Sequence, residues 1–569
     1  MGLTTALQIS RSGMTANSEA ISITGNNIAN VNTTAFKSSQ SRFETQVSQL
    51  VGSGSAPTAE QGGVNPLQVG LGTRLGGTRR DFSKGALQPT GVNTDLAIEG
   101  NGFFVVRFGE NERYTRDGSF QLDRDLNLVT PTGGKVQGNP VDANFNIASG
   151  TVGDINVPIG TLTIAEATTE VRFGGNLNAD GDIASIPGVH LSDAITDSSS
   201  ASPMTLASLL ADLEDSGGTA LFATGDVITI TGAQKGGATL PSHSFEVGAT
   251  NTTGADANGT TVADFTAFLE DIFGIDNTLG GAGVTVNGTG QLVVTSNLGE
   301  DNAVLLEPAD VIVNADTTPT LPFDFTQSQE ADGESVRTTF VAYDSLGSPM
   351  QIDLTLVLEA KSNAGTSWRY FAQSETDSDL ARAMGTGTLN FNIQGQLVSS
   401  AGATFTINRD GTGAVTPQTV SLIFDHPSSP VSALADANSE ISALSQDGSP
   451  IGTLEDFSVG SDGTINGVFT NSLIRTLGRV VLAQFSNPQA LGDEGGNLYQ
   501  VTPNSGLPAI VAPGGAGTGA IVGGALELSN VELSQEFINL ISATTGFSAS
   551  SRVLTSSDRL IQELLATVR

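Results

Sequence analysis

The apolar residues at the two ends of this chain recur at steps of four and three positions, the spacing of a helix that packs along a seam. On this stripe, six of nine positions are apolar between residues 3 and 31, and eight of eleven between residues 533 and 568. The apolar positions are Leu3, Leu7, Met14, Ile21, Ile28 and Val31 at the first end, and Leu533, Phe537, Leu540, Phe547, Leu554, Ile561, Leu565 and Val568 at the second. The sequence therefore predicts α-helical coiled-coil ends.

Both predicted helices contain glycine: Gly13 and Gly25 in the first, and Gly546 in the second. Each glycine costs about 1 kcal/mol of helix stability relative to alanine, and a lone helix of this length is marginal in water. We therefore expect the ends to be disordered in the free chain and to fold when they meet each other or a neighbouring subunit. An ordinary helical hairpin packed on a globular core is the alternative.

The sequence between the two ends has a residue pattern that is typical of β-strands joined by tight turns. Its 569 residues include 69 glycines, and short alternating segments are separated by Gly, Asn and Asp turns. This length has room for three to five domains. The predicted fold class is mainly β and multidomain, with nested, discontinuous β domains between the helical ends.

The chain is expected to leave and return through its domains, which brings the two termini together. The predicted parts are terminal helices (1–31 and 532–569), a connector (32–78 and 524–531), an inner β domain (79–147 and 437–523), a middle β domain (148–195 and 322–436) and an inserted domain (196–321). The insertion holds 16 acidic residues and a single basic one, Lys235. It also contains an amphipathic helix candidate, Val262–Phe273.

Charge and composition exclude several classes of partner. The net charge is −35, so the surface repels nucleic acid and anionic lipid. No apolar run reaches the roughly 18 residues of a membrane span, and the first residues lack the features of a secretory signal peptide. There is no cysteine, which excludes disulfides and thiolate chemistry. If the protein is exported, we expect export without a cleaved signal.

No catalytic residue, cofactor site or metal site is predicted. The three histidines are far apart in the sequence, and Asp123 and Asp125 are not followed by the spacing of a calcium loop. The glycine-rich segment 70–77 lacks the Lys-Ser/Thr of a phosphate loop. Two carboxylates placed by the fold would suffice for a glycosidase, so that alternative stays open.

The segment after the first helix, GNNIANVNTTAFK, is rich in residues whose side chains satisfy backbone groups where a helix ends. It resembles the signature of the flagellar rod and hook protein family. The residues that carry this resemblance are Gly25, Asn26, Asn27, Asn30, Asn32, Thr33, Thr34, Phe36 and Lys37. Residues 527–565 are similar to the C-terminal motif of the same family, and 95–104 with 114–120 to its first β domain.

Two further segments, AYDSLGSP at 342–349 and LGRVVLAQFSNPQAL at 477–491, resemble the hook type rather than the rod type. One departure lies at 544–550, where TTGFSAS replaces the usual Gln-Arg-Ala-Phe-Gln-Ala-Asn run of the family. The apolar packing of Phe547 therefore carries over, while the polar contacts of that run do not.

The resemblance implies an extracellular structural subunit of the flagellar hook. It implies export by the flagellar type III apparatus and self-assembly into a curved tube, with the terminal helices lining the channel. The implied partners are further copies of the chain, the rod protein, the hook cap and the hook–filament junction proteins. The alternatives are a distal rod or other axial protein, and a secreted β-rich adhesin or binding protein.

Overall fold

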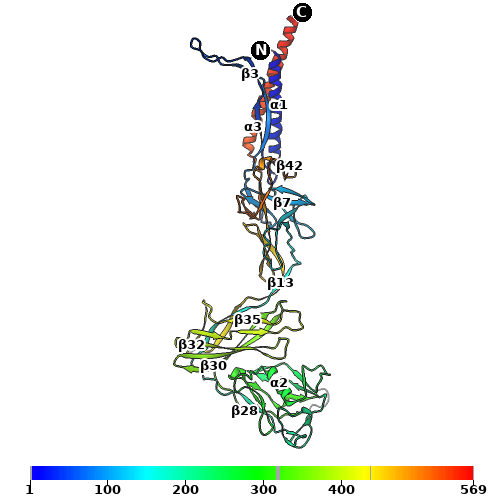
Figure 1. Cartoon of the computed structure of the whole chain (residues 1–569), viewed down its shortest axis with the longest axis vertical. Helices are drawn as coiled ribbons and strands as arrows, with labels where there is room; N and C mark the ends of the chain where they lie inside the picture. The colour runs from blue at the N-terminus through cyan, green and yellow to red at the C-terminus, as the bar shows by residue number, and fades with distance from the viewer. Residues whose placement is uncertain (1–2, 315–320, 428, 436, 568–569) are drawn as a thin grey trace. The chain divides into compact units, whose positions relative to one another are not determined.

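The computed structural model describes residues 3–314, 321–427, 429–435 and 437–567. The described chain is mostly β, with three α-helices, and the two terminal helices pack together (Figure 1). The predicted fold class is therefore confirmed. The chain divides into two compact units, Met1–Thr163 with Thr453–Arg569, and Ile164–Gly452. The predicted limits of the inner β domain, at residues 147 and 436, each precede one of the two points at which the units divide. The predicted domains stay a prediction.

In the first unit, helix α1 spans Leu3–Ala29 and helix α3 spans Leu533–Thr567. Strands β1 (Ser39–Thr45) and β4 (Thr73–Arg80) form an antiparallel ribbon against α1. Among the described residues, no helix is long and apolar enough to cross a membrane.

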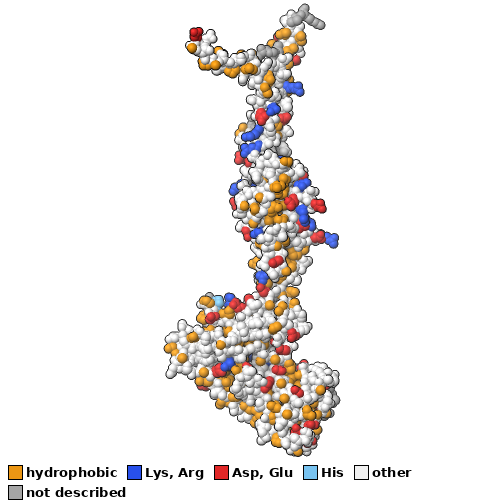
Figure 2. All heavy atoms as spheres, in the orientation of Figure 1, with side chains coloured by type: hydrophobic (Ala, Val, Ile, Leu, Met, Phe, Trp, Pro, Cys, Tyr) orange, Lys and Arg blue, Asp and Glu red, His pale blue; other side chains and the backbone are white. Residues whose placement is uncertain are grey.

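The predicted connector contains a second hairpin, made by β2 (Ser48–Gly52) and β3 (Leu67–Gly70). Its apolar side chains, which include Val47, Leu50 and Leu67, are exposed (Figure 2). Because an isolated two-stranded hairpin is marginal in water, these residues are expected to need a covering surface.

The largest sheet holds 14 strands, draws on both halves of the chain and lies mainly in the first unit. Its strands are β7 (Phe103–Phe108), β8 (Asn111–Thr115), β9 (Gln121–Leu122), β10 (Leu128–Val129), β11 (Lys135–Pro140), β12 (Gly153–Asp154), β13 (Thr163–Glu166), β38 (Ser449–Val459), β39 (Thr464–Phe469), β40 (Ile474–Val480), β41 (Leu482–Gln484), β42 (Gly492–Gly495), β43 (Leu498–Gln500) and β44 (Ala509–Val511). Aromatic edge-to-face contacts among Phe103, Tyr114, Phe485 and Tyr499 fill one of its cores.

Two short strand pairs join segments that lie more than 400 residues apart in the chain. Strand β5 (Leu87–Pro89) pairs with β46 (Ala525–Glu527), and β6 (Leu96–Glu99) pairs with β45 (Ala520–Gly523). The outgoing and returning chains are thus held together immediately before α3 begins.

In the second unit, a five-stranded antiparallel meander faces a second five-stranded sheet. The meander is β29 (Ser335–Tyr343), β30 (Pro349–Ser362), β31 (Gly365–Ser374), β32 (Ala383–Asn392) and β33 (Leu397–Ala401); the other sheet is β14 (Glu170–Asn178), β34 (Thr404–Ile407), β35 (Gln418–Ile423), β36 (Val431–Leu434) and β37 (Glu440–Gln446). Trp368, Tyr370, Phe173 and Phe405 are buried between the sheets.

The remainder of this unit is built around helix α2, Val262–Phe273, which confirms the predicted amphipathic helix. Thr261 and Asp264 form a capping box at its start, and its buried face carries Phe265 and Phe268. The strands around it are β15 (Val189–Leu191), β16 (Thr196–Asp197), β17 (Ser202–Pro203), β18 (Leu213–Glu214), β19 (Val227–Ile230), β20 (Gln234–Lys235), β21 (Ala238–Thr239), β22 (His243–Val247), β23 (Ala257–Gly259), β24 (Gly283–Val286), β25 (Leu292–Thr295), β26 (Val304–Leu305), β27 (Val311–Val313) and β28 (Thr326–Gln329). The sheet β24-β25-β15-β28 extends past the predicted insertion limits of 196 and 321 on both sides.

Candidate assembly site

Helices α1 and α3 contact each other through small and polar side chains. A Cβ added at Gly13 would lie 2.8 Å from Ser550 Oγ, and one added at Gly546 would lie 2.8 Å from Asn17 Oδ1. At the other end of the contact, Asn27 Nδ2 donates to Glu536 Oε1 at 3.2 Å. From pair to pair, the residue numbers rise along α1 while they fall along α3, so the helices are antiparallel. Gly13 and Gly546, which weaken the isolated helices, allow their close approach.

The most buried residues of α1 follow the same contact line and are small or polar. They are Ser10, Ala16, Ala20, Thr24 and Asn27. Those of α3 are Glu536, Ala543 and Ser557. The spacing of the two predicted seams also passes through the polar residues Asn17, Thr24, Thr544 and Asp558. Asn17 lies in the contact and Thr24 is buried, while Thr544 and Asp558 are exposed.

The large apolar residues of the predicted seams lie beside this contact line or away from it. Leu7, Met14, Ile21, Ile28, Val31, Leu540, Phe547, Leu554 and Ile561 are half-buried. Leu533, Phe537 and Leu565 are exposed. Leu3 begins α1, but its side chain lies outside the described residues, as does the whole of Val568. The structure thus brings the two helices together while most of the seam's large side chains are only partly buried.

Helix α3 carries exposed apolar side chains in two stripes. Leu533, Phe537 and Ile541 recur every four residues, and the side chains of Phe537 and Ile541 are 49% and 64% exposed. Val553, Leu560 and Leu564 form a second stripe nearer the end of the helix. Contiguous exposed apolar surface of this kind marks an interaction site. Within this chain, the described residues leave both stripes uncovered.

The chain segment after α1 is fixed by hydrogen bonds from asparagine side chains. Asn27 Oδ1 accepts from Ser39 N at 3.0 Å, and Asn27 Nδ2 donates to Ser39 O at 2.8 Å. Asn530 Oδ1, just before α3, accepts from Ser38 N at 2.8 Å. Asn27 is 1% exposed, so these bonds are shielded from water and hold the exit of α1 next to the entry of α3.

Lys37, the last residue of the motif that resembles the family signature, lies in a buried cluster of charged side chains. Its Nζ lies 2.7 Å from Glu527 Oε1, and both side chains are fully buried. Arg116 Nη1 lies 3.3 Å from Glu527 Oε2, and Gly85 N donates to Glu527 Oε1 at 2.9 Å. Burial lowers the pKa of Lys37 while Glu527 opposes that shift, and the same two causes act on the pKa of Arg116. A single carboxylate therefore joins the segment after α1, the residues that follow β8 and the segment before α3.

The other motif residues shape the turn between α1 and β1. Asn30 Nδ2 donates to Asn26 O at 2.9 Å, and Thr33 Oγ1 donates to Asn30 Oδ1 at 3.1 Å. Asn497 Nδ2 donates to Thr34 O at 2.7 Å. Of the remaining motif residues, Phe36 is half-buried, while Gly25 and Asn32 are exposed.

Sequence reasoning missed Arg116, Glu527 and Asn530 as functional residues. Glu527 and Asn530 lie in the segment 527–565, whose similarity to the family's C-terminal motif was their only signal. Arg116 lies in YTRDGSF, where an arginine between strands has the appearance of a surface residue.

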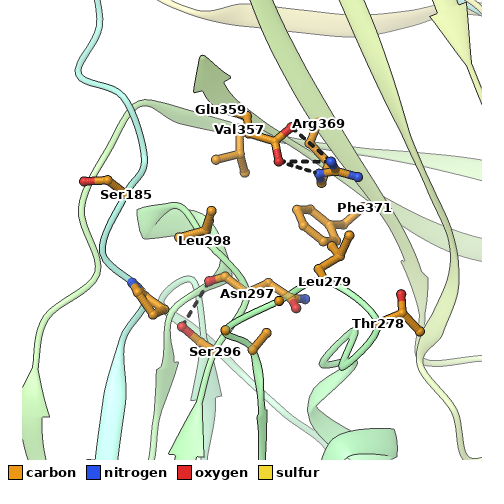
Figure 3. A pocket seen from close by; sticks show the side chains of 14 residues that line it. Ser185, Thr278, Leu279, Ser296, Asn297, Leu298, Val357, Glu359, Arg369 and Phe371 are labelled. Atoms are coloured by element: carbon orange, nitrogen blue, oxygen red, sulfur yellow. Dashed lines mark hydrogen bonds and ion pairs between the residues drawn. The ribbon is translucent and has the colours of Figure 1, made fainter.

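The described residues contain no group of three or more His, Asp or Glu side chains that could hold a metal ion. The second unit has a cavity of about 400 Å³, lined by Leu279, Leu298 and Phe371 among others (Figure 3). Its charged groups, Arg369 and Glu359, pair with each other at 2.9 Å. Among the described residues that line the cavity, these two are the charged ones, and each is the partner of the other.

Four family models match the chain. They are the flagella basal body rod protein at residues 7–37, the flagellar hook protein FlgE/F/G D1 domain at 97–184, the flagellar basal body protein FlaE D2 domain at 312–449, and the flagellar basal body rod FlgEFG protein C-terminal at 522–567. The matches include both terminal helices and the Lys37–Glu527 cluster.

Relatives match along the whole chain. The flagellar hook protein FlgE of Borreliella burgdorferi is 28% identical over 97% of each chain, and that of Escherichia coli is 25% identical over 97% of this chain and 98% of its own. A solved structure of Helicobacter pylori flagellar hook protein FlgE2 is 17% identical, covers 76% of this chain and 98% of its own, and has a TM-score of 0.38.

Paired terminal helices joined to discontinuous β domains, together with the matching family models and the hook protein relatives, define an axial structural protein of the bacterial flagellum. Within that class, the chain belongs to the flagellar hook protein family.

The contact of α1 with α3 predicts a specific cross-link. A Cβ at Gly13 lies 3.6 Å from Ser550 Cβ, within the range of a disulfide. The variant Gly13→Cys with Ser550→Cys is expected to form an intrachain disulfide, detected by non-reducing electrophoresis and mass spectrometry. The chain has no other cysteine to compete.

The matched control is Gly25→Cys with Ser550→Cys, because Gly25 lies about 18 Å further along α1. This pair is expected to stay reduced under the same oxidation. Interchain bonds alone in the Gly13 pair would show that the helices pair between subunits instead.

The buried cluster predicts a large stability loss for Glu527→Gln, because the substitution leaves two buried cations without their carboxylate. The expected cost is about 3–5 kcal/mol. Calorimetry of the full chain would measure it, while Trp368 fluorescence reports separately on the second unit, in which that residue is buried.

The control variant is Glu99→Gln. Glu99 Oε1 lies 3.7 Å from Lys84 Nζ. The side chain of Glu99 is 55% exposed and that of Lys84 is 62% exposed. Its expected cost is below about 1 kcal/mol. Equal effects of the two substitutions would contradict the role assigned to Glu527.

Proposed function

We propose that this chain is the structural subunit of a bacterial flagellar hook, and that it polymerises through its terminal helices into a curved, flexible tube that transmits motor torque to the filament. The observation that carries the proposal is the pair of exposed apolar stripes on α3. The closest approaches of α1 and α3 are made by small and polar residues, and the exposed side chains of the two stripes stay available for neighbouring copies.

The energetic argument favours ordering during assembly. Full burial of a Phe, Leu or Ile side chain contributes about 1.5–3 kcal/mol. In the single chain, Phe537, Ile541 and Leu564 forgo about half of this gain or somewhat more, because about half or more of each side chain is exposed. Neighbours that cover them would supply the free energy that offsets the ordering of two glycine-containing helices.

Helices that order only on assembly also suit export. A chain with disordered ends and no disulfide can pass unfolded through a narrow channel, and it does not polymerise before it arrives. We propose export by the flagellar type III apparatus without a cleaved signal, to the hook outside the cell. The proposed partners are the rod protein, the hook cap and the hook–filament junction proteins, besides other copies of the chain.

The β domains would surround a tube lined by the terminal helices. A surface with net charge −35 and many polar turns offers contacts of similar energy in several registers, so neighbouring domains could slide as the hook bends. The proposed role is mechanical, without catalysis, cofactor, nucleic-acid binding or membrane insertion. A distal rod subunit is less favoured because the relatives matched from end to end are named hook proteins.

The test compares polymerisation of the full chain with that of Phe537→Ser/Ile541→Ser. Losing about 3 kcal/mol of burial is expected to raise the critical concentration for tubes about 100-fold. Sedimentation and negative-stain microscopy would measure it. A chain that lacks residues 1–31 and 532–569 is expected to stay monomeric.

The control is Leu507→Ser/Val415→Ser, which removes apolar side chains that are 86% and 64% exposed elsewhere in the chain. Its critical concentration is expected to stay within a few-fold of the wild-type value. The proposal would be contradicted if the truncated chain formed tubes, or if the full chain stayed monomeric under every condition.

A further inference from the structure

His190 is a buried histidine whose imidazole ring has no hydrogen-bond partner. It is the central residue of β15 and is 1% exposed. Both ring nitrogens, Nδ1 and Nε2, are buried and have no partner among the described residues. Burying an unpartnered polar group is costly, and burying an unpartnered charge is far more costly. The imidazole ring is therefore held in its neutral form in the folded chain.

The side chain of His190 faces an apolar core. His190 pairs with Val294 of β25, and Val294 pairs in turn with Val284 of β24. Residues directly opposite each other in antiparallel strands lie on the same face of a sheet. Val284 and Val294 belong to the core that contains Phe265 and Phe268 of α2. A proton on His190 would therefore place a charge against hydrocarbon.

The buried hydroxyl groups that follow β15 and β25 are engaged with the backbone. Ser192 Oγ donates to Asp193 O at 2.8 Å, and Ser296 Oγ donates to Asn297 O at 3.1 Å. Each of these hydroxyl oxygens also accepts a hydrogen bond from a backbone N–H group. Neither hydroxyl group is bonded to the imidazole ring of His190.

His190 also lacks a carboxylate that would stabilise its charged form. The four strands of its sheet, β24, β25, β15 and β28, carry no acidic or basic residue. On the neighbouring segments, Glu270 of α2, Asp193 after β15 and Asp332 after β28 accept hydrogen bonds from backbone N–H groups. Burial accordingly lowers the pKa of His190 below its ordinary value of about 6.5.

His190 lies where the chain enters and leaves the part of the second unit that is built around α2. Strand β15 is the first strand of this α2 region, and β28, which follows it by more than 130 residues, is the last. The two strands pair with each other, and His190 lies opposite Gln327 in that pairing. This strand pair therefore holds the two ends of the α2 region together.

We propose that His190 makes the α2 region acid-sensitive, because its protonation opens the sheet β24-β25-β15-β28 at the strands where the chain enters and leaves. The stability that depends on neutral His190 is complete above about pH 6.5, the pKa of an exposed histidine. As the pH falls below that value toward the lowered pKa of the folded state, only the open form binds the proton. The open fraction then rises about tenfold for each pH unit.

Other titrating groups of the α2 region behave differently in this range. Hydrogen bonds from Thr252 and Thr253 lower the pKa of Glu246 to about 2, so its charge does not change between pH 7.5 and pH 5.5. Burial raises the pKa of Asp271, whose protonation stabilises the closed form as the pH falls. The contribution of His190 is therefore isolated by comparing variants at each pH.

The test is amide hydrogen exchange of the full chain at pH 7.5 and pH 5.5, with each rate divided by that of an unstructured peptide at the same pH. In the unmodified chain, the protection of β15, β25 and β28 is expected to fall about tenfold at the lower pH. The protection of β30 and β31 is expected to stay the same.

His190→Phe, which has no titrating group, is expected to abolish the fall. If this variant does not fold, His190→Gln provides the same comparison. The control is His243→Gln in β22, because His243 Nδ1 already lies 3.5 Å from Asp256 Oδ2, and this variant should keep the fall. Equal protection of the unmodified chain at both pH values, or a fall that persists without His190, would overturn the proposal.

Discussion

The carboxylate of Glu527 is the point on which the first unit depends. This carboxylate forms ion pairs with Lys37 and Arg116 in a site that is closed to water. The backbone carbonyl of Glu527 accepts a hydrogen bond from Ala35 N at 2.7 Å. The outgoing chain after α1, the residues that follow β8 and the returning chain before α3 all meet here. A buried charge without its partner costs several kcal/mol of stability. The three segments are therefore stable in this arrangement only when all of them are in place. The cluster therefore couples the two helices to the β domain that carries them.

The helix pair shows how a close contact between two helices and an exposed apolar surface can coexist in one chain. Gly13 against Ser550 and Gly546 against Asn17 let the helices approach closely while using little apolar area. The larger side chains, such as Phe537 and Ile541, remain outside the contact. The pair is therefore weak when alone and strengthened by whatever covers α3. Assembly and helix formation become one event.

The sequence was informative wherever a local pattern is decisive. The spacing of apolar residues was enough to predict α1, α3 and the amphipathic α2, since helix formation depends on residues three and four apart. The stripe at steps of four and three passes through Ser10 and Thr24, which are buried, but it does not include the buried Ala20, because seam analysis follows the apolar spacing alone. Nor could the sequence pair Lys37 with Glu527, or β15 with β28, since those contacts depend on how distant segments fold. The insertion's limits were uncertain for the same reason.

The central claim is that α1 and α3 become ordered when neighbouring subunits cover α3. Amide hydrogen exchange of residues 3–29 and 533–567, compared between the monomer and the assembled tube, tests it most directly. We predict fast exchange of both segments in the monomer and at least about 1000-fold slower exchange in the tube, while β30 and β31 are protected in both. Equal, strong protection of both helices in the monomer would contradict the claim, because the pair would then be stable without a neighbour.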